Sequence, residues 1–332
     1  MIEELAPAHV DTIRPLLEQS RHTPHRFLFR DIPRELAAYW FDEIAGWVRS
    51  GDGEVFVAHE GGRLLGLAAY SALPWDSALF KQPMGAIKYV VVDAEAPAPL
   101  AKELVEAVEA WARARGVAFL LCKTHTDDMQ LIHALEVNGF LLMDTLIDYV
   151  YDARRFPSAD IIAPPAPPGF SVRLAGATDL DQLAQVARAA FIGHFGRYNS
   201  DPRITPAQSA QVYEEWVRSC ARGYADWIVV AECDGVIAGY SIWKNPSNAE
   251  SALSVRVGHF SIMGVHPDFR GRGLFGPLAY AGMELLRGIA DCIEGPTHIN
   301  NYPVQRGYSR LQWHGADAHH SFHRWLTGQR VE

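Results

Sequence analysis

The run VHPDFRGRGLFGP, from Val265 to Pro277, places two glycines and two arginines between an apolar strand and an apolar helix. Amides at a helix start lack intrahelical partners, and the helix dipole adds partial positive charge there. Gly271 and Gly273 permit backbone angles that let such amides converge on a ligand. Arg270 and Arg272 add positive charge at the rim. The turn therefore predicts an anion site for phosphate or pyrophosphate, although an ordinary strand-to-helix turn fits the spacing equally well.

A tyrosine and an asparagine follow this turn in the run THINNYPVQRGYSRLQW, residues 297–313. The phenol of Tyr308, with an ordinary pKa of about 10, could act as a proton donor in a reaction. The amide of Asn301 can hydrogen-bond a bound molecule. The alternatives are a packed aromatic ring on a short helix for Tyr308 and a cap or turn residue for Asn301.

The loop FIGHFGRYNSDPRI, residues 191–204, joins two predicted helices and could choose a substrate. Its aromatic and basic side chains include His194, Phe195, Arg197 and Tyr198. Aromatic rings beside arginines suit a sugar, a nucleotide or an acidic small molecule, whereas a packed loop with a solvated charged rim is the alternative.

Two residues on predicted strands, His259 and Glu232, have side chains that could act as a general base. Each could instead be an outward-pointing or satisfied polar side chain, and a chain of waters could replace a dedicated base. The histidines at 319, 320 and 323 have no carboxylate or cysteine at a ligand spacing, so the sequence predicts no metal site.

The elements that position these residues occur twice. An offset of 173 residues places VAHEGGRLLG, residues 57–66, on VAECDGVIAG, residues 230–239. The same offset places Val92 on Val265, and Thr124 on Thr297. Each copy predicts two helices, a hairpin with a glycine turn, a further strand, a long helix and closing strands around a short helix. We expect an α/β fold of the α+β type, with two tandem domains.

A proline-rich run, PSADIIAPPAPPGF at residues 157–170, separates the copies and predicts a semi-rigid connection. The expected boundaries are a first domain over residues 1–152, a linker over 153–169 and a second domain over 170–332. In each domain we expect a central mixed, mostly antiparallel sheet flanked by helices.

Two spaced motifs of the second copy resemble those of the GCN5-related N-acetyltransferase (GNAT) family. VHPDFRGRG followed by a helix is similar to the family's R-x-x-G-x-G/A segment, with Arg270 and Gly273 in place. Phe275 stands where a small residue is usual, which requires room from Gly276 or from an altered helix start. The downstream run is similar to T-x-x-x-N with a later Y-x-x-x-G-F, but Gln312 replaces the glycine.

This resemblance implies an acetyl-coenzyme A-dependent N-acetyltransferase that acts on a primary amine of a small molecule. Tyr308 would be the catalytic acid, and His194, Phe195, Arg197, Tyr198 and His259 would contact the acceptor. The acceptor loop is similar to those of bacterial enzymes that act on nucleotide-linked amino sugars. The resemblance assigns the coenzyme to Met263, Gly264, Val265, Arg270, Gly271, Arg272, Gly273, Leu274, Phe275, Gly276 and Asn301.

The first copy keeps the scaffold without this chemistry. The offset places Arg270 on Pro97, Arg272 on Pro99 and Tyr308 on Leu135. Prolines remove amide donors, so we expect a degenerate first copy that binds no coenzyme A. A non-catalytic acyl-coenzyme A sensor is the competing hypothesis, and a purely assembling protein with a vestigial turn is a third.

Composition narrows the partners. The net charge of −9 argues against a nucleic-acid scaffold, and no run is long and apolar enough to span a membrane. The N-terminus lacks the pattern of a signal peptide, and the four cysteines are widely spaced. We expect a cytoplasmic protein, monomeric or homodimeric, that binds neither nucleic acid nor membrane.

Overall fold

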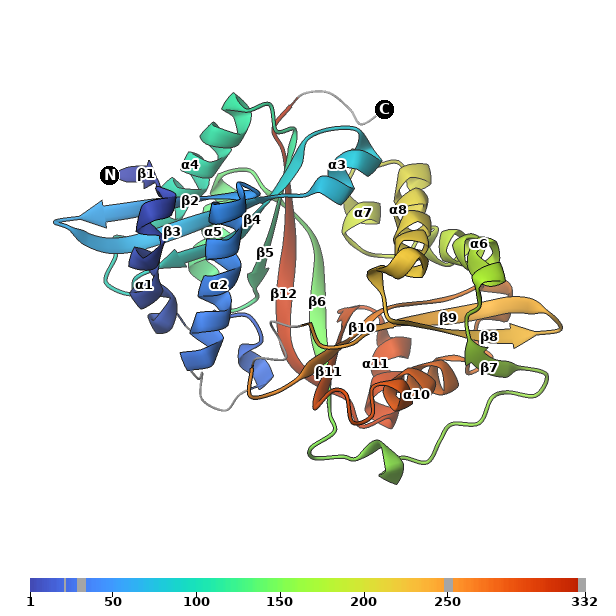
Figure 1. The fold of residues 1–332 in the computed structure, drawn as a ribbon. Coiled ribbons are helices and arrows are strands. Elements are labelled where there is room, and N and C mark those ends of the chain that lie inside the picture. The colour runs from blue at the N-terminus through green and yellow to red at the C-terminus, as the bar shows by residue number, and fades with distance from the viewer. Residues whose placement is uncertain (21, 29–33, 248–252, 328–332) are drawn as a thin grey trace. The chain divides into compact units, whose positions relative to one another are not determined.

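The computed structural model describes residues 1–20, 22–28, 34–247 and 253–327 (Figure 1). The chain forms two compact units. The first unit contains Met1–Thr145 and the C-terminal segment that begins at Ala318, and the second contains Leu146–Asp317. None of the described helices combines the length and the apolar character needed to cross a bilayer.

The first unit is a mixed sheet between two layers of helices, and its strands are ordered β1-β2-β3-β4-β5-β12. Its strands are β1 (Ile2–Glu4), β2 (Gly53–Glu60), β3 (Arg63–Ala72), β4 (Met84–Val92), β5 (Phe119–His125) and β12 (His314–Trp325). Its helices are α1 (Arg14–Gln19), α2 (Arg34–Ser50), α3 (Pro74–Phe80), α4 (Leu100–Ala114) and α5 (Met129–Val137).

Strand alternation divides this unit's core. Phe56 and Ala58 of β2 pack with α4 and α5 on one face of the sheet, while Val55 and Val57 pack with α1 and α2 on the other. Helix α2 forms because its apolar residues recur every three or four positions, and the resulting stripe is buried. Figure 1 shows these helices on the two faces of the strands.

The second unit repeats this arrangement, with strands ordered β6-β11-β10-β9-β8-β7. Its strands are β6 (Leu141–Asp152), β7 (Ser171–Leu174), β8 (Trp227–Cys233), β9 (Val236–Lys244), β10 (Val257–Val265) and β11 (Cys292–His298). Its helices are α6 (Leu180–Phe191), α7 (Arg197–Ser200), α8 (Pro206–Ser219), α10 (Phe275–Leu285) and α11 (Tyr302–Arg310). Helices α6 and α8 cover one face, and α10 and α11 cover the other (Figure 1).

The duplication is visible element by element. Shifted by 173 residues, β4, β5, α5 and β6 fall on β10, β11, α11 and β12 with identical bounds. Even the irregularities correspond, because the register of β4 shifts at Lys88 and the register of β10 shifts at the equivalent Ser261. The two copies therefore share one backbone design, down to the bulge beside the parallel strand pair.

The last strand of each copy pairs with a strand of the other copy. Strand β12 pairs antiparallel with β5, from His319 opposite His125 to Trp325 opposite Phe119. Strand β6 pairs antiparallel with β11, from Leu146 opposite His298 onward, which is the same register after the offset. The division between the units consequently falls inside β6 and β12. It differs from the boundaries expected from the sequence, because a strand's pattern does not reveal which sheet will accept it.

The proline-rich segment lies along α10 within the second unit. The guanidinium of Arg287 donates to the hydroxyl of Ser158 at 2.9 Å. At the other end of α10, a Cβ built on Gly276 would lie 3.0 Å from Pro164. The rings of Phe170 and Phe269 are 5.9 Å apart. The segment therefore forms a wall of this unit as well as a connection.

Candidate functional site

The parallel strands β10 and β11 part halfway along their length. Within the described residues, their paired positions run from Val257 to His259 on β10 and from Cys292 to Glu294 on β11. Strand β10 then continues through Met263 and Gly264 to Val265, still paired with β9 alone. The three residues predicted to contact the coenzyme arm thus lie where β10 turns one hydrogen-bonding edge away from its neighbour.

Gly264 is required there by its own sheet. A Cβ on Gly264 would lie 2.8 Å from the ring of Tyr240, which is fully buried. In the first copy the equivalent pair is Val91 and Leu67. The second copy thus has a smaller residue, Gly264, on β10 and a larger one, Tyr240, on β9. The glycine is a packing requirement as well as a place where a ligand could approach the backbone.

The loop after β10 presents consecutive unused amides. Gly271 and Gly273 have φ values of +75° and +81°, and a Cβ at either would meet nothing within 4 Å. Conformation, not space, therefore favours glycine at both positions. In the part of the chain that the structure describes, no carbonyl accepts from the amides of Gly271, Arg272, Gly273 or Leu274. Together with the start of α10, these amides offer a phosphate several backbone donors at the positive end of the helix dipole.

The first copy lacks this group of amides. Pro97 and Pro99 stand in place of Arg270 and Arg272 and have no N–H. The amide of Leu100, equivalent to that of Gly273, donates to the carbonyl oxygen of Pro97 at 3.0 Å. The residues before α4 consequently offer no run of consecutive open amides like that at 271–274.

Phe275 is accommodated by Gly307 and not by Gly276, the residue that the sequence suggested. A Cβ on Gly307 of α11 would lie 2.4 Å from Cδ1 of Phe275. The ring therefore turns inward, where it meets Tyr308 at a centroid distance of 5.5 Å. Gly276 instead faces Pro164 of the proline-rich segment. The loop keeps its open side although a large residue begins the helix.

Tyr308 lies deep in an aromatic cluster beside the parting strands. Its side chain is 2% exposed and stacks on Tyr149 and Trp313, each at 4.8 Å. A Cβ on Gly295 would lie 2.7 Å from the Tyr308 hydroxyl and 3.1 Å from Phe260. Burial raises the pKa of Tyr308 far above that of a free phenol, with a smaller contribution from the neighbouring Tyr149. The phenol thus keeps its proton and holds it at the point where β10 and β11 separate.

Asn301 is the N-cap residue of α11, and its side chain donates to the hydroxyl of Thr297 at 3.1 Å. Asn301 thus stands at the position of the cap that the sequence offered as the alternative, but its side chain makes no hydrogen bond to the first amides of the helix. The hydrogen bond to Thr297 fixes the start of α11 against the end of β11, and so helps to position Tyr308 two turns later.

His194 and Phe195 of the acceptor loop meet the end of β11. Their rings are 4.3 Å apart, and the ring of Phe195 is 4.5 Å from that of His298. Burial, followed by the charges of His298 and Arg270, lowers the pKa of His194 to about 4. His194 is therefore neutral at physiological pH. The sequence pattern alone does not point to His298. The offset places it on His125 of the first copy, whose ring centroid is 5.4 Å from that of His22.

The other two loop residues are placed against α8. Tyr198 is buried and meets the ring of Tyr213 edge-on, and the guanidinium of Arg197 lies 4.4 Å above the Tyr198 ring. Tyr198 thus contributes to the packing of the loop more than to an open surface.

His259 lies beside a carboxylate that the sequence did not reveal. Its Nδ1 lies 2.9 Å from a carboxylate oxygen of Glu294, its partner in the parallel register. Because Phe260 and Ile293 face α10, this pair points to the opposite face, toward α6 and α8. The first copy has Ala86 and Leu121 at the equivalent positions, and that change from apolar to ionisable residues was an available clue. The other candidate for the general base, Glu232, accepts a hydrogen bond from the guanidinium of Arg173 at 2.9 Å. The same guanidinium also binds Asp179.

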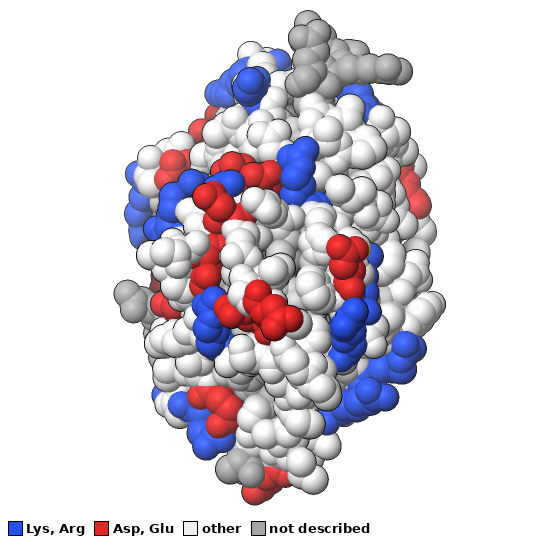
Figure 2. Space-filling model, turned by 90° about the vertical axis from the view of Figure 1, so that its right-hand side faces the viewer, with Lys and Arg blue, Asp and Glu red and all other residues white. Residues whose placement is uncertain are grey.

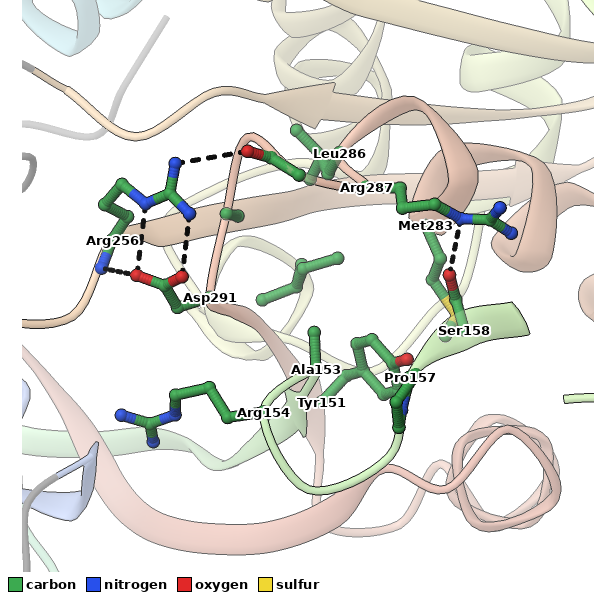
Figure 3. A pocket seen from close by; sticks show the side chains of 13 residues that line it. Tyr151, Ala153, Arg154, Pro157, Ser158, Arg256, Met283, Leu286, Arg287 and Asp291 are labelled. Atoms are coloured by element: carbon green, nitrogen blue, oxygen red, sulfur yellow. Dashed lines mark hydrogen bonds and ion pairs between the residues drawn. The ribbon is translucent and has the colours of Figure 1, made fainter. Parts of the chain in front are cut away.

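A pocket of about 350 Å³ lies near the starts of β10 and β11, at the end opposite the loop of residues 271–274 (Figure 3). Its walls are mostly apolar, with Met283 and Leu286 of α10 among them. Two of the arginines at its rim are engaged, since Arg256 binds Asp291 at 2.8 Å and Arg287 binds Ser158. Among the described residues, no cluster of His, Cys, Asp or Glu is arranged to hold a metal ion.

Charged side chains of both signs intermingle on the face of the molecule shown in Figure 2. Oppositely charged side chains also pair along α8, where Glu214 binds both Arg188 and Arg218 at 3.2 Å. Exposed pairs of this kind contribute little to stability individually.

Comparisons with known proteins agree with this architecture. Residues 18–140 match the model of the acetyltransferase (GNAT) family. The match covers the first copy, whereas the open amide loop lies in the second. The chain is 22% identical over 283 residues to the spore coat polysaccharide biosynthesis protein SpsD of Bacillus subtilis (strain 168), covering 80% of this chain and 86% of SpsD.

Two solved structures show the same fold along nearly the whole chain. A tandem GNAT protein from the clavulanic acid biosynthesis pathway is 16% identical, with a TM-score of 0.60 and 99% of both chains covered. A GCN5-related glucosamine N-acetyltransferase region of a fungal multi-domain GH3 β-N-acetylglucosaminidase is 15% identical, with a TM-score of 0.63. That match covers 98% of this chain and 38% of the fungal chain.

Proposed function

We propose that the second unit of this chain transfers an acetyl group from acetyl-coenzyme A to a small-molecule amine. The match of residues 18–140 to the GNAT acetyltransferase family and the likeness of the fold to a tandem GNAT protein support this proposal. The observation that carries the proposal is the set of open amides at Gly271–Leu274, beside strands that part at His259 and Glu294. A diphosphate fits the first feature, and an extended acyl arm fits the second.

Coenzyme A would supply an activated acyl thioester, and the chain's residues would do the rest. The amides of residues 271–274 would hold the diphosphate. The backbone of Met263, Gly264 and Val265 would align the arm and offer donors to the thioester oxygen. Tyr308, protonated and placed at the parting of the strands, would give its proton to the departing sulfur.

The attacking amine must lose a proton, and we assign this step to His259 with Glu294. The carboxylate of Glu294 would stabilise the imidazolium that forms on His259. Both side chains lie on the face covered by α6 and α8, the side from which the acceptor loop also projects. The amine would thus approach from one face of the sheet, while α10 and the coenzyme loop lie on the other.

For the acceptor, we propose an amino sugar, in particular a nucleotide-linked one. Phe195, 37% exposed, can stack on a sugar ring beside His298, and neutral His194 can exchange hydrogen bonds with hydroxyl groups. Similarity to a polysaccharide biosynthesis protein and to a glucosamine N-acetyltransferase region supports this choice.

Calorimetry with acetyl-coenzyme A, followed by an assay of free thiol release over a panel of amino sugars, tests the proposal. We expect one binding site per chain. Gly273→Ala should weaken coenzyme binding about tenfold or more, because an L-residue resists the left-handed backbone. Gly235→Ala is the matched control: its φ is +77° and its surroundings are open, but it lies in the β8–β9 turn. Failure of the wild-type chain to bind acetyl-coenzyme A would end the enzyme hypothesis.

A further inference from the structure

The side chain of Arg270 reaches away from its own loop. Its Nη2 donates to the carbonyl oxygen of Ala190 at 2.7 Å. Ala190 belongs to the last turn of α6, whose end at Phe191 leaves carbonyl groups without intrahelical donors. A guanidinium there satisfies one of these acceptors and interacts favourably with the negative end of the helix dipole.

The acceptor loop leaves α6 immediately after this contact. The ring of His194 packs against Phe191 at 5.2 Å and against Phe195 at 4.3 Å, and Phe195 continues the series to His298. Arg270 is close enough to His194 for its charge to lower the pKa of that imidazole, together with burial and His298. The arginine of the coenzyme loop is therefore part of the structure that holds the acceptor loop.

The neighbouring arginine makes no such link. The guanidinium of Arg272 lies 5.8 Å from the ring of Phe269, within its own loop. Both arginines are exposed and both lie beside the open amides. In the first copy the equivalents of Arg270 and Ala190 are Pro97 and Leu17. Because proline has no side-chain donor, this hydrogen bond cannot form there.

We infer that Arg270 is a positioning residue that couples the two loops, so that a coenzyme on the amides of residues 271–274 prepares the acceptor loop for its substrate. The inference rests on the proposed function and adds to it a coupling between the two binding sites. A ligand that fixes the coenzyme loop also fixes Arg270, and through Ala190 it restrains residues 192–196. Linkage then requires the acceptor to strengthen coenzyme binding by the same factor.

The first experiment compares Arg270→Gln, Arg270→Lys and Arg272→Gln in steady-state kinetics. Both Gln variants remove one charge near the diphosphate and should raise the KM for acetyl-coenzyme A similarly. Only Arg270→Gln should also raise the acceptor KM, by about fivefold, with kcat changed less. Arg270→Lys should recover part of this loss, because an ammonium can still reach the Ala190 carbonyl. An equal rise in acceptor KM for Arg272→Gln would overturn the coupling.

The second experiment needs no enzymatic activity and separates failure of the coupling from failure of the proposed function. NMR titration of His194 in the ligand-free protein should give a higher pKa in Arg270→Gln than in wild type, and no change in Arg272→Gln. The direction follows from losing a nearby positive charge, and burial should still keep the value below about 6.5. An unchanged His194 titration would overturn the link, whether or not the chain proves to be an acetyltransferase.

Hydrogen exchange with coenzyme A as the probe completes the test. Bound coenzyme A should protect the amides of residues 192–196 in wild type and in Arg272→Gln. In Arg270→Gln, at a coenzyme concentration that saturates the variant, that protection should be lost while residues 271–274 stay protected. Equal protection of residues 192–196 in all three proteins would contradict the inference.

Discussion

The ring of Phe275 occupies the space that Gly307 leaves by having no side chain, with only 2.4 Å between Cδ1 and the position of a Gly307 Cβ. This contact joins the first turn of α10 to the middle of α11. It packs the end of the loop at residues 271–274 against the helix that carries Tyr308. The positions of both therefore depend on the absence of a side chain at Gly307.

Gly307→Ala should therefore destabilise the protein by about 1–3 kcal/mol, because the added methyl group must displace Phe275 from a filled core. Denaturant unfolding measures the effect. Gly46→Ala, also within a helix but with nothing within 4 Å of the new Cβ, should instead be neutral or stabilising by up to about 1 kcal/mol. If both substitutions behave alike, the Phe275 contact is not what selects glycine at position 307.

Gln312→Gly should stabilise the protein by about 1 kcal/mol, because Gln312 adopts a left-handed φ of +64° that costs less for glycine. The first copy has Gly139 at the equivalent position, with φ of +74°. The shift in the urea midpoint measures the gain. Gln312→Ala serves as the control and should give no comparable gain, since alanine has the same steric restriction.

Tyr308→Phe should lower turnover about 100-fold while coenzyme affinity changes little, because the ring still fills its buried site but offers no proton. Thiol release and calorimetry give the two quantities. Tyr302→Phe, which removes an exposed hydroxyl from the same helix, should leave both unchanged. A parallel loss of affinity and turnover in Tyr308→Phe would favour the acyl-coenzyme A sensor over the enzyme.

His259→Gln should reduce kcat/KM about tenfold or more at neutral pH, and Glu294→Gln should reduce it less, since it removes the partner and keeps the base. Glu232→Gln is the control: it breaks a pair with Arg173 on the same sheet without touching the proposed proton path. If Glu232→Gln lowers the rate as much as His259→Gln, the base has been assigned to the wrong strand.

Native-state alkylation should distinguish the cysteines. Burial raises the pKa of Cys220 to about 11 and that of Cys292 to about 12, and it raises the pKa of buried Cys122 as well. Because the thiolate is the nucleophile, these three should react slowly with iodoacetamide at pH 8, while partly exposed Cys233 reacts first. Mass spectrometry of the labelled peptides gives the order. In denaturant all four should react at similar rates.

The repeat offset predicted much of the fold, because hairpin turns and apolar periodicity depend on local sequence. It placed the two helices before each hairpin and the long helix after the strand that follows each hairpin. It also pointed to the loop at 271–274. The sequence shows glycines there, whereas prolines stand at the equivalent positions of the first copy. Family resemblance then supplied Tyr308 and Asn301, whose roles in the chain depend on packing around α11.

The other features of the fold and of the candidate site could not be predicted, because they depend on contacts between residues far apart in the sequence. Which helix would make room for Phe275 was invisible, since Gly307 is 32 positions away and Gly276 is adjacent. Glu294 and His298 became candidates only when β11 was seen beside His259 and the acceptor loop. The reciprocal pairing of β6 and β12 was likewise hidden, because both strands would satisfy either sheet equally well by pattern.

That reciprocal pairing has a consequence for biosynthesis. The antiparallel neighbour of β5 is β12, which lies in the last twenty residues of the chain. The amino-terminal sheet therefore cannot be completed until β12 has been synthesised, after the rest of the second copy, and the unsatisfied backbone of β5 must be shielded until then. The half that folds first need not be the half that is made first.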